Sequence, residues 1–201
     1  MYSCPVYQRY LRSIQPNNSE QKQISKINLN NVMRMLWEQH VEWTRMAITG
    51  AVNNLPDADL TAKRLLENPD DFAAALEPFY GEKIASQFGT LLKAHLVIAS
   101  QLVDAAKAGD NQKATELEKK WYANADEIAV FLGKINPYWS QEEWRKMLYE
   151  HLALTKKEAV DMITKNYADS INVYDEIEKQ ALKMADMMTE GILKQFPHMF
   201  T

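Results

Sequence analysis

The sequence predicts an all-α protein built as an up-and-down four-helix bundle with an additional C-terminal helix or helix extension. Three observations support this prediction. Hydrophobic residues make up 46% of the 201 residues, which is enough for a substantial core. Only six Gly and seven Pro are present, and apolar residues recur at helical spacing over long segments. Such a helix order is compatible with a ferritin-like or DinB-like architecture.

The first helix is expected over residues 31–54, after an unpatterned polar segment. Residues 1–29 carry no helical stripe and are interpreted as a flexible arm that can dock through Tyr2, Tyr7 and Tyr10. Residues 30–201 are expected to form the bundle domain. Pro56 favours an end of the first helix just before it, because proline disfavours helix in the residue that precedes it.

The middle of the chain predicts two short helices followed by two long ones. The short helices are expected over 58–68 and 70–78, with Pro69 suited to a first helical turn. Long helices are expected over 82–108 and 112–133, joined by a short turn at Gly109 that favours antiparallel neighbours.

The C-terminal third begins with a capping box, Ser140 to Glu143, in which the two side chains satisfy free amides of a helix start. From Gln141 to Phe196 there is no proline and one glycine. This segment is either one very long helix or two helices broken near Asn166 and Tyr167, and Pro197 ends it.

Three of the four histidines are predicted to point into the bundle. His40, His95 and His151 each follow a large apolar residue by four positions and lie among apolar residues of their own helical stripe. Each lies near the middle of its helix, so antiparallel packing would bring the three imidazoles to one level. Their spacing of 55 and 56 residues also suggests a weak internal repeat.

Convergent imidazoles are typical ligands of divalent metals. The hypothesis is therefore a metal site for Zn, Fe, Mn or Ni, formed by His40, His95 and His151 with Asp126 as a fourth ligand from the third long helix. Asp126 shares a helix face with Tyr122 and Ala129 and is expected to point inward. An open coordination position would let the metal activate water, but the sequence identifies no catalytic residue, and it leaves open whether the protein is an enzyme.

The alternative is a non-catalytic structural or protein-interaction bundle in which the same histidines are hydrogen-bonded core residues. A buried histidine more often serves packing than metal binding, because a single neighbouring polar group satisfies it. The five tryptophans are likewise interpreted as core and bundle-end packing, with a small-molecule pocket as the other reading.

Charge and motifs exclude several function classes. The net charge of −4 argues against nucleic acid as a partner. The chain has no Gly-rich phosphate loop, so no nucleotide is expected. No apolar run reaches the roughly 20 residues of a membrane span. The single cysteine, Cys4, indicates a reducing compartment, and a cytoplasmic location is therefore expected. A homodimer is compatible with spare apolar helix faces.

Several segments carry a resemblance to an uncharacterised family of short bacterial all-α proteins. They are LWEQHVEWTR, NPDDFA, WYANADEIA, INPYWSQEEWRKMLYEHL and GILKQFPHMF, and the resemblance covers roughly residues 31–200. Some members are labelled acetylglutamate kinase. This sequence does not support that label, because it has neither the strands nor the glycine-rich loops of an ATP-binding α/β kinase.

Overall fold

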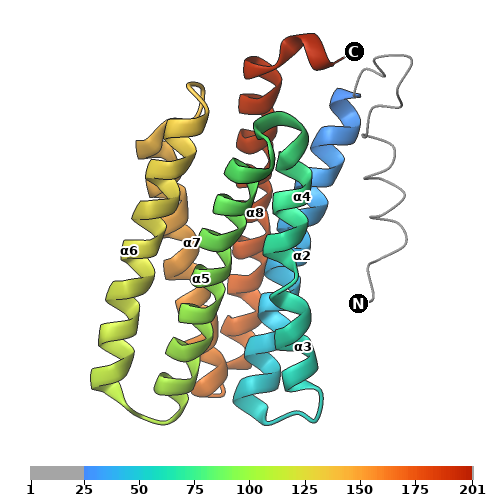
Figure 1. Ribbon diagram of the computed structural model, residues 1–201. Coiled ribbons are helices and arrows are strands. Elements are labelled where there is room, and N and C mark those ends of the chain that lie inside the picture. The colour runs from blue at the N-terminus through green and yellow to red at the C-terminus, as the bar shows by residue number, and fades with distance from the viewer. Residues whose placement is uncertain (1–24, 201) are drawn as a thin grey trace.

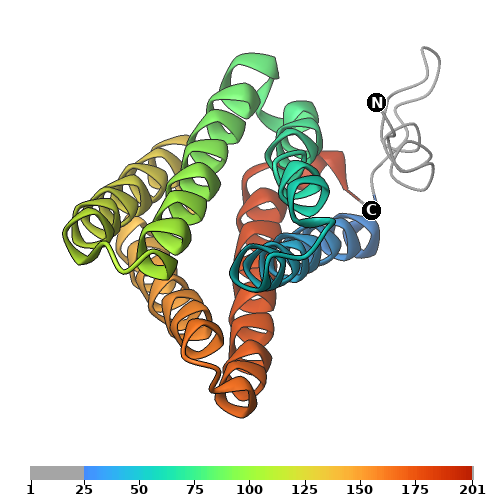
Figure 2. The same cartoon turned by 90° about the horizontal axis from the view of Figure 1, so that it is seen from below.

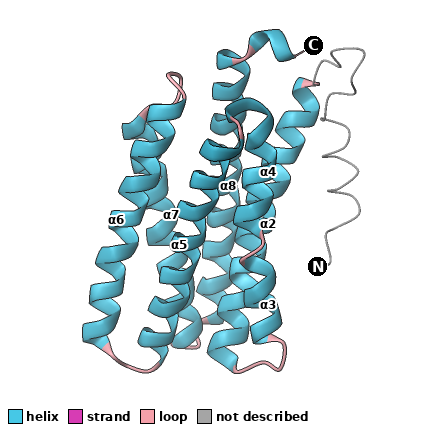
Figure 3. Cartoon of the chain, in the orientation of Figure 1, coloured by secondary structure: helices cyan, strands magenta, loops and turns pink. Residues whose placement is uncertain are grey.

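The computed structural model describes residues 25–200, and this part of the chain is helical without any β-strand (Figures 1 and 3). The predicted all-α class is confirmed. Its elements are α2 (Lys26–Asn53), α3 (Ala58–Leu65), α4 (Asn68–Tyr80), α5 (Glu82–Lys107), α6 (Asn111–Ile135), α7 (Gln141–Ile163), α8 (Tyr167–Gln195) and the 3-10 turn η1 (Pro197–Met199).

The long helices run up and down and surround a common centre (Figure 2). Helix α3 packs against α2, each helix from α4 to α7 packs against the next along the chain, and α2 packs against α8, so the first and last helices close the ring. The short helices α3 and α4 follow one another, α3 against α2 and α4 against α5 and α2, and together they take the place of one long helix (Figure 1). The expected count of four core helices with one added helix is not confirmed by this arrangement.

The first helix starts earlier than the sequence predicted. Ser25 caps α2 by accepting a hydrogen bond from the backbone N–H of Asn28 at 3.4 Å. Residues 26–29 therefore belong to the helix rather than to the expected arm. Tyr2, Tyr7 and Tyr10, with the rest of the predicted arm, lie outside the described residues.

The C-terminal segment forms two helices. Of the two interpretations offered by the sequence, the one with a break near Asn166 and Tyr167 is confirmed. Helix α7 ends at Ile163 and α8 begins at Tyr167. Lys165 between them has a φ of 63°, in the left-handed region that ends a helix. The capping box is only half formed in the described contacts, where Ser140 accepts from the Glu143 N–H at 3.3 Å.

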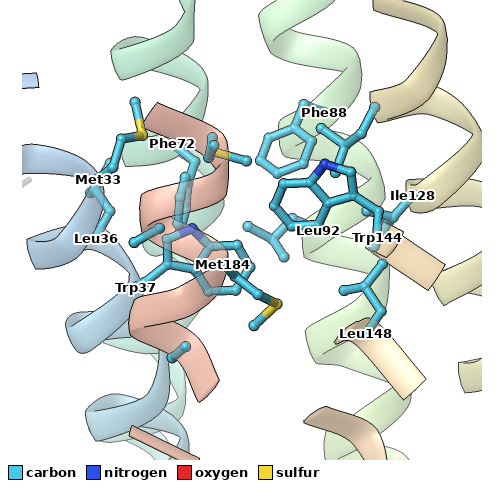
Figure 4. Close-up of a cluster of buried hydrophobic side chains, with 14 of the residues drawn as sticks. Met33, Leu36, Trp37, Phe72, Phe88, Leu92, Ile128, Trp144, Leu148 and Met184 are labelled. Carbon is cyan, nitrogen blue, oxygen red and sulfur yellow. The ribbon is translucent and has the colours of Figure 1, made fainter. Parts of the chain in front are cut away.

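The core consists of large apolar side chains from all the long helices and α4, and Figure 4 shows part of this cluster. At one end, the indole of Trp139 lies directly on the backbone of Gly191, where an added Cβ would be 1.9 Å from Nε1. Its N–H donates to the carbonyl of Met187 at 3.1 Å, which ties the α6–α7 loop to α8. None of the helices described is long and apolar enough to cross a membrane.

Candidate functional site

The three histidines lie inside the bundle at one level, as predicted. His40 on α2, His95 on α5 and His151 on α7 are 2%, 3% and 3% exposed, and all three line one small void. The ring centroids of His40 and His151 are 5.8 Å apart. The stripe and depth arguments made from the sequence are therefore confirmed for all three side chains.

Each imidazole is held by a side-chain amide from the following helix of the ring. The Nδ1 atoms of His40, His95 and His151 lie 3.0, 2.9 and 3.2 Å from amide oxygens of the partner side chains. Those partners are, in the same order, Asn68 at the start of α4, Asn124 on α6 and Gln180 on α8.

The amides are oriented by a second contact. In each case the amide NH2 donates to the backbone carbonyl four residues before the histidine, which belongs to Leu36, Leu91 or Met147, at 3.0, 3.2 and 2.8 Å. The amide oxygen must then face the imidazole, so Nδ1 carries the proton and donates it. We call this three-part arrangement the histidine–amide clamp.

The clamp recurs with nearly constant spacing. Histidine and amide are 28 residues apart in the first copy and 29 in the second and third. The first clamp joins α2 to α4, the second α5 to α6, and the third α7 to α8. The repeat suspected around the histidines therefore includes a second helix in each copy. The sequence signal for this second helix is the amide residue of each clamp, which was not predicted.

The fixed tautomer leaves Nε2 as a lone-pair acceptor in all three rings. His95 uses it to accept the indole N–H of Trp121 at 3.1 Å. Within residues 25–200, Nε2 of His40 and of His151 makes no hydrogen bond. These two atoms are the free basic groups of the layer.

Burial keeps the three imidazoles neutral. Desolvation lowers the pKa of His40 to about 4 and that of His95 to about 3, with the neighbouring His40 adding to the second effect. The pKa of His151 is also lowered well below its ordinary value, mainly by burial. Near neutral pH the layer therefore consists of uncharged bases.

Asp126 does not join the histidines. Its side chain is 44% exposed and pairs with Arg145 at 2.8 Å, while Tyr149 donates to it at 3.1 Å. The inward-facing polar residue of α6 is Asn124, because the buried stripe of this helix runs through Trp121, Asn124 and Ile128. The expectation that Asp126 points into the bundle was wrong by half a helical turn.

No group of three or more His, Cys, Asp or Glu in the described part of the chain is placed so that it could hold a metal ion. The void between the histidines is small, and one of the three Nε2 atoms is already occupied by Trp121. A metal shared by all three rings would require His95 to release that indole.

A buried ion pair joins three helices about two turns along α7 from His151. Glu158 on α7 has a side-chain exposure of 1% and accepts from Arg45 on α2 at 2.5 Å. Arg45 also donates to the carbonyl of Ser170 at 3.1 Å and lies over the Tyr174 ring on α8. Burial raises the pKa of Glu158 to about 7, against the opposing effect of Arg45.

A large cavity begins one turn beyond the histidines and opens at the end of the bundle where α2, α5 and α7 end. Its volume is about 650 Å³, and its lining comes from α2, α3, α5, α6 and α7. Most lining side chains are small or aliphatic, among them Ala47, Leu96, Ala99 and Ala159. Trp121 borders the cavity and also donates to His95, so it separates the cavity from the histidine layer.

The cavity has polar groups at both ends. Thr44 and Thr155, each four residues after a histidine, line it near that layer. At the mouth, Lys107 reaches from α5 to the end of α2, where it donates to the Ala51 carbonyl and to Asn54, both at 2.6 Å. The mouth is therefore bridged by one lysine side chain.

The chain matches no protein-family model, no curated protein and no solved structure.

Proposed function

We propose that this protein is a binding protein that holds a small, mainly apolar molecule in the cavity next to its histidine layer. The observation that carries the proposal is the cavity itself. Protein interiors are close-packed, and voids larger than a water molecule are few. A space of about 650 Å³ lies in the range of pockets that accommodate small ligands.

The surrounding structure supports a preformed site. The three clamps fix the helices on one side of the cavity, and each adds two hydrogen bonds between neighbouring helices. The lining alanines leave the space open at positions where leucine or phenylalanine would fill it. A rigid frame with small residues around an open interior suits ligand binding, because little ordering is needed when the ligand enters.

A neutral fluorescent probe, N-phenyl-1-naphthylamine, tests this function. We expect saturable binding to the full chain, with enhanced and blue-shifted probe emission. Ala99→Phe fills part of the cavity and is expected to weaken binding by about tenfold or more. Ala168→Phe is the matched control, because Ala168 is exposed on α8 and lies outside the cavity lining.

Thermal unfolding of each variant shows whether it is folded. Ala47→Ile is a milder second filling variant at another lining position. Absence of saturable binding to the folded wild-type protein, or equal binding by Ala99→Phe and Ala168→Phe, would refute the proposal.

A second candidate function is binding of a divalent metal by His40, His95 and His151. The observation in its favour is the common tautomer. Metal-bound histidines usually donate the other ring N–H to a neighbouring acceptor, and all three clamps provide such an acceptor. Zn, Fe, Mn and Ni remain the proposed metals, and Asp126 is no longer among the proposed ligands because of its place at the surface.

Titration with Co(II), followed by its visible absorption, tests the metal candidate. Trp121→Phe frees Nε2 of His95 and is expected to tighten Co(II) binding, whereas His95→Ala is expected to weaken it. Weak binding that neither variant changes would show that any metal sits elsewhere.

Four broader interpretations are also proposals. The repeated clamp supports a description of the bundle as three related helical hairpins, in place of a four-helix core with an added helix. A cytoplasmic location rests on the single cysteine, and membership of the short bacterial family rests on the quoted segments. A homodimer is compatible with exposed apolar residues such as Ile171 and Val130.

A further inference from the structure

We infer that the ligand of this cavity is an amphiphile, a molecule with an apolar tail and a polar head, which binds with its tail at the closed end and its head at the mouth. The inference rests on the proposed binding function and names the chemical class and the orientation of the ligand. The closed end lies beside Trp121, and the mouth lies at Lys107.

The polar side chains at the closed end are already used within the protein or are inaccessible. The indole N–H of Trp121 donates to His95. The Thr44 hydroxyl donates its proton to the carbonyl of His40, and the Thr155 hydroxyl has almost no accessible surface. A polar ligand group placed here would lose its water without gaining a donor from the protein, which weakens binding.

The wall near this end is apolar and suits a hydrocarbon tail. It includes Leu96 and Ala99 on α5, Ala47 on α2 and Ala159 on α7. Burial of apolar surface is favourable in proportion to the area removed from water. A tail in this part of the cavity therefore contributes most of the binding free energy.

The mouth has the opposite character, because charged and amide side chains surround it. Asn54, Asp59, Asp104 and Lys107 all line the cavity and are all exposed. Lys107 donates to the Ala51 carbonyl and to Asn54, and its ammonium group has a third proton to donate. A polar head at the mouth leaves these groups hydrated or hydrogen-bonded, whereas an apolar end would cover them.

The charges around the cavity do not favour a head group of one sign. Asp59 and Asp104 are negative and Lys107 is positive, and all three are exposed to water, which screens them. Lys156 and Glu118, which also line the cavity, pair with each other at 2.6 Å. The ligand is therefore selected by its apolar tail, and its head has only to be polar.

The distance along the bundle sets the length of the ligand. Thr44 and Asn54 both line the cavity and are ten residues apart along α2, which corresponds to about 15 Å along the helix axis. An extended chain advances about 1.2 Å per bond, so about ten to twelve bonds span this distance.

Displacement of a bound probe tests which end of the ligand is buried. N-phenyl-1-naphthylamine is bound to the full chain and is then displaced by 1-decanol or by 1,10-decanediol, which has a second hydroxyl at the tail end. We expect the 1,10-diol to need a concentration about tenfold higher, because its second hydroxyl is buried without a donor. The control is 1,2-decanediol, which carries both hydroxyls at the head and should act at a concentration close to that of 1-decanol.

Fluorescence quenching by bromine locates the tail. Trp121 borders the cavity, so its emission reports on a bromine atom at the closed end. We expect 10-bromo-1-decanol, with bromine at the tail, to quench more strongly than 2-bromo-1-decanol, with bromine beside the head. This difference should be lost in Trp121→Phe and kept in Trp43→Phe, because Trp43 lies outside the cavity lining and packs against Arg64.

The outcomes separate the orientation from the binding function on which it rests. If the probe binds but 1,10-decanediol displaces it as well as 1-decanol does, or 2-bromo-1-decanol quenches Trp121 more strongly, the orientation is wrong while the cavity remains a binding site. If the probe binds and 1-decanol does not displace it, the amphiphile class is wrong. If the probe itself does not bind, the proposed function fails, and this inference fails with it.

Discussion

Acidification should destabilise the protein through its buried histidines, and the first clamp provides a measurable case. The perturbation is the double variant His40→Leu/Asn68→Leu, which replaces both clamp side chains by apolar groups of similar size. Replacing both partners avoids the unpaired polar atom that a single substitution would leave. The quantity of interest is the difference in pH dependence between this variant and the wild type.

The magnitude follows from the pKa of His40. Burial lowers this pKa from 6.5 to about 4 in the folded state. As pH falls below about 6.5, the unfolded chain takes up the proton first, so the free energy of unfolding decreases by about 1.4 kcal/mol per pH unit. The loss ends once pH falls below about 4, and it amounts to about 3 kcal/mol in total.

Two carboxyl groups act in the opposite direction and are common to both proteins. Burial raises the pKa of Glu158 to about 7 and that of Asp71 to about 6, so the folded state holds these protons more tightly than the unfolded one. Acidification stabilises the fold through them. They offset only part of the loss caused by the three histidines, and the comparison with the variant isolates the contribution of His40.

The assay is urea unfolding followed by circular dichroism at several values between about pH 7 and pH 4. The wild type should lose about 3 kcal/mol more than the double variant across this range, whatever their relative stability at neutral pH. Parallel stability curves for the two proteins would refute the reasoning, because they would mean that His40 can be protonated in the folded state at little cost.

Two further predictions concern the stability of the fold. Gly191→Ala should lower the free energy of unfolding in urea by several kcal/mol, because the new Cβ would be 1.9 Å from Nε1 of Trp139. Glu190→Ala, at the exposed neighbouring position, should change it by less than about 0.5 kcal/mol, and similar values for the two variants would contradict the close packing. Ser140→Ala removes the acceptor for the Glu143 N–H and should lower the unfolding free energy by about 1 kcal/mol, and an unchanged urea midpoint would show that the cap is not needed.

The sequence was sufficient to predict which histidines face inward, because helical periodicity depends on local spacing alone. His40, His95 and His151 each lie on an apolar stripe, and burial follows from that position. Their hydrogen-bond partners were not predicted, since pairing a residue with another about 29 positions away requires the angle at which two helices pack. The equal spacing of Asn68, Asn124 and Gln180 was the available signal.

The placement of Asp126 shows where periodicity alone is too coarse. Residues 124 and 126 differ by about 200° around a helix, and the boundary between the buried and exposed faces of α6 passes between them. Tyr122, which was used to place Asp126 inside, lies at that boundary and packs on the half-buried Tyr149. The cavity could not be predicted either, because an alanine that lines an open space has the same periodicity as one in a packed core.

The closure of the ring by α2 and α8 has a consequence for how the chain could be connected. These helices are antiparallel neighbours, and Asp186 accepts from both Asn30 and Arg34, so residues 25 and 200 lie at the same end of the bundle. A short linker between those ends, with new termini in the loop at the exposed Tyr138, would give a circular permutant. Because each clamp lies within one hairpin, this permutant would retain all three clamps. We therefore expect the packing of the hairpins to be independent of their order along the chain.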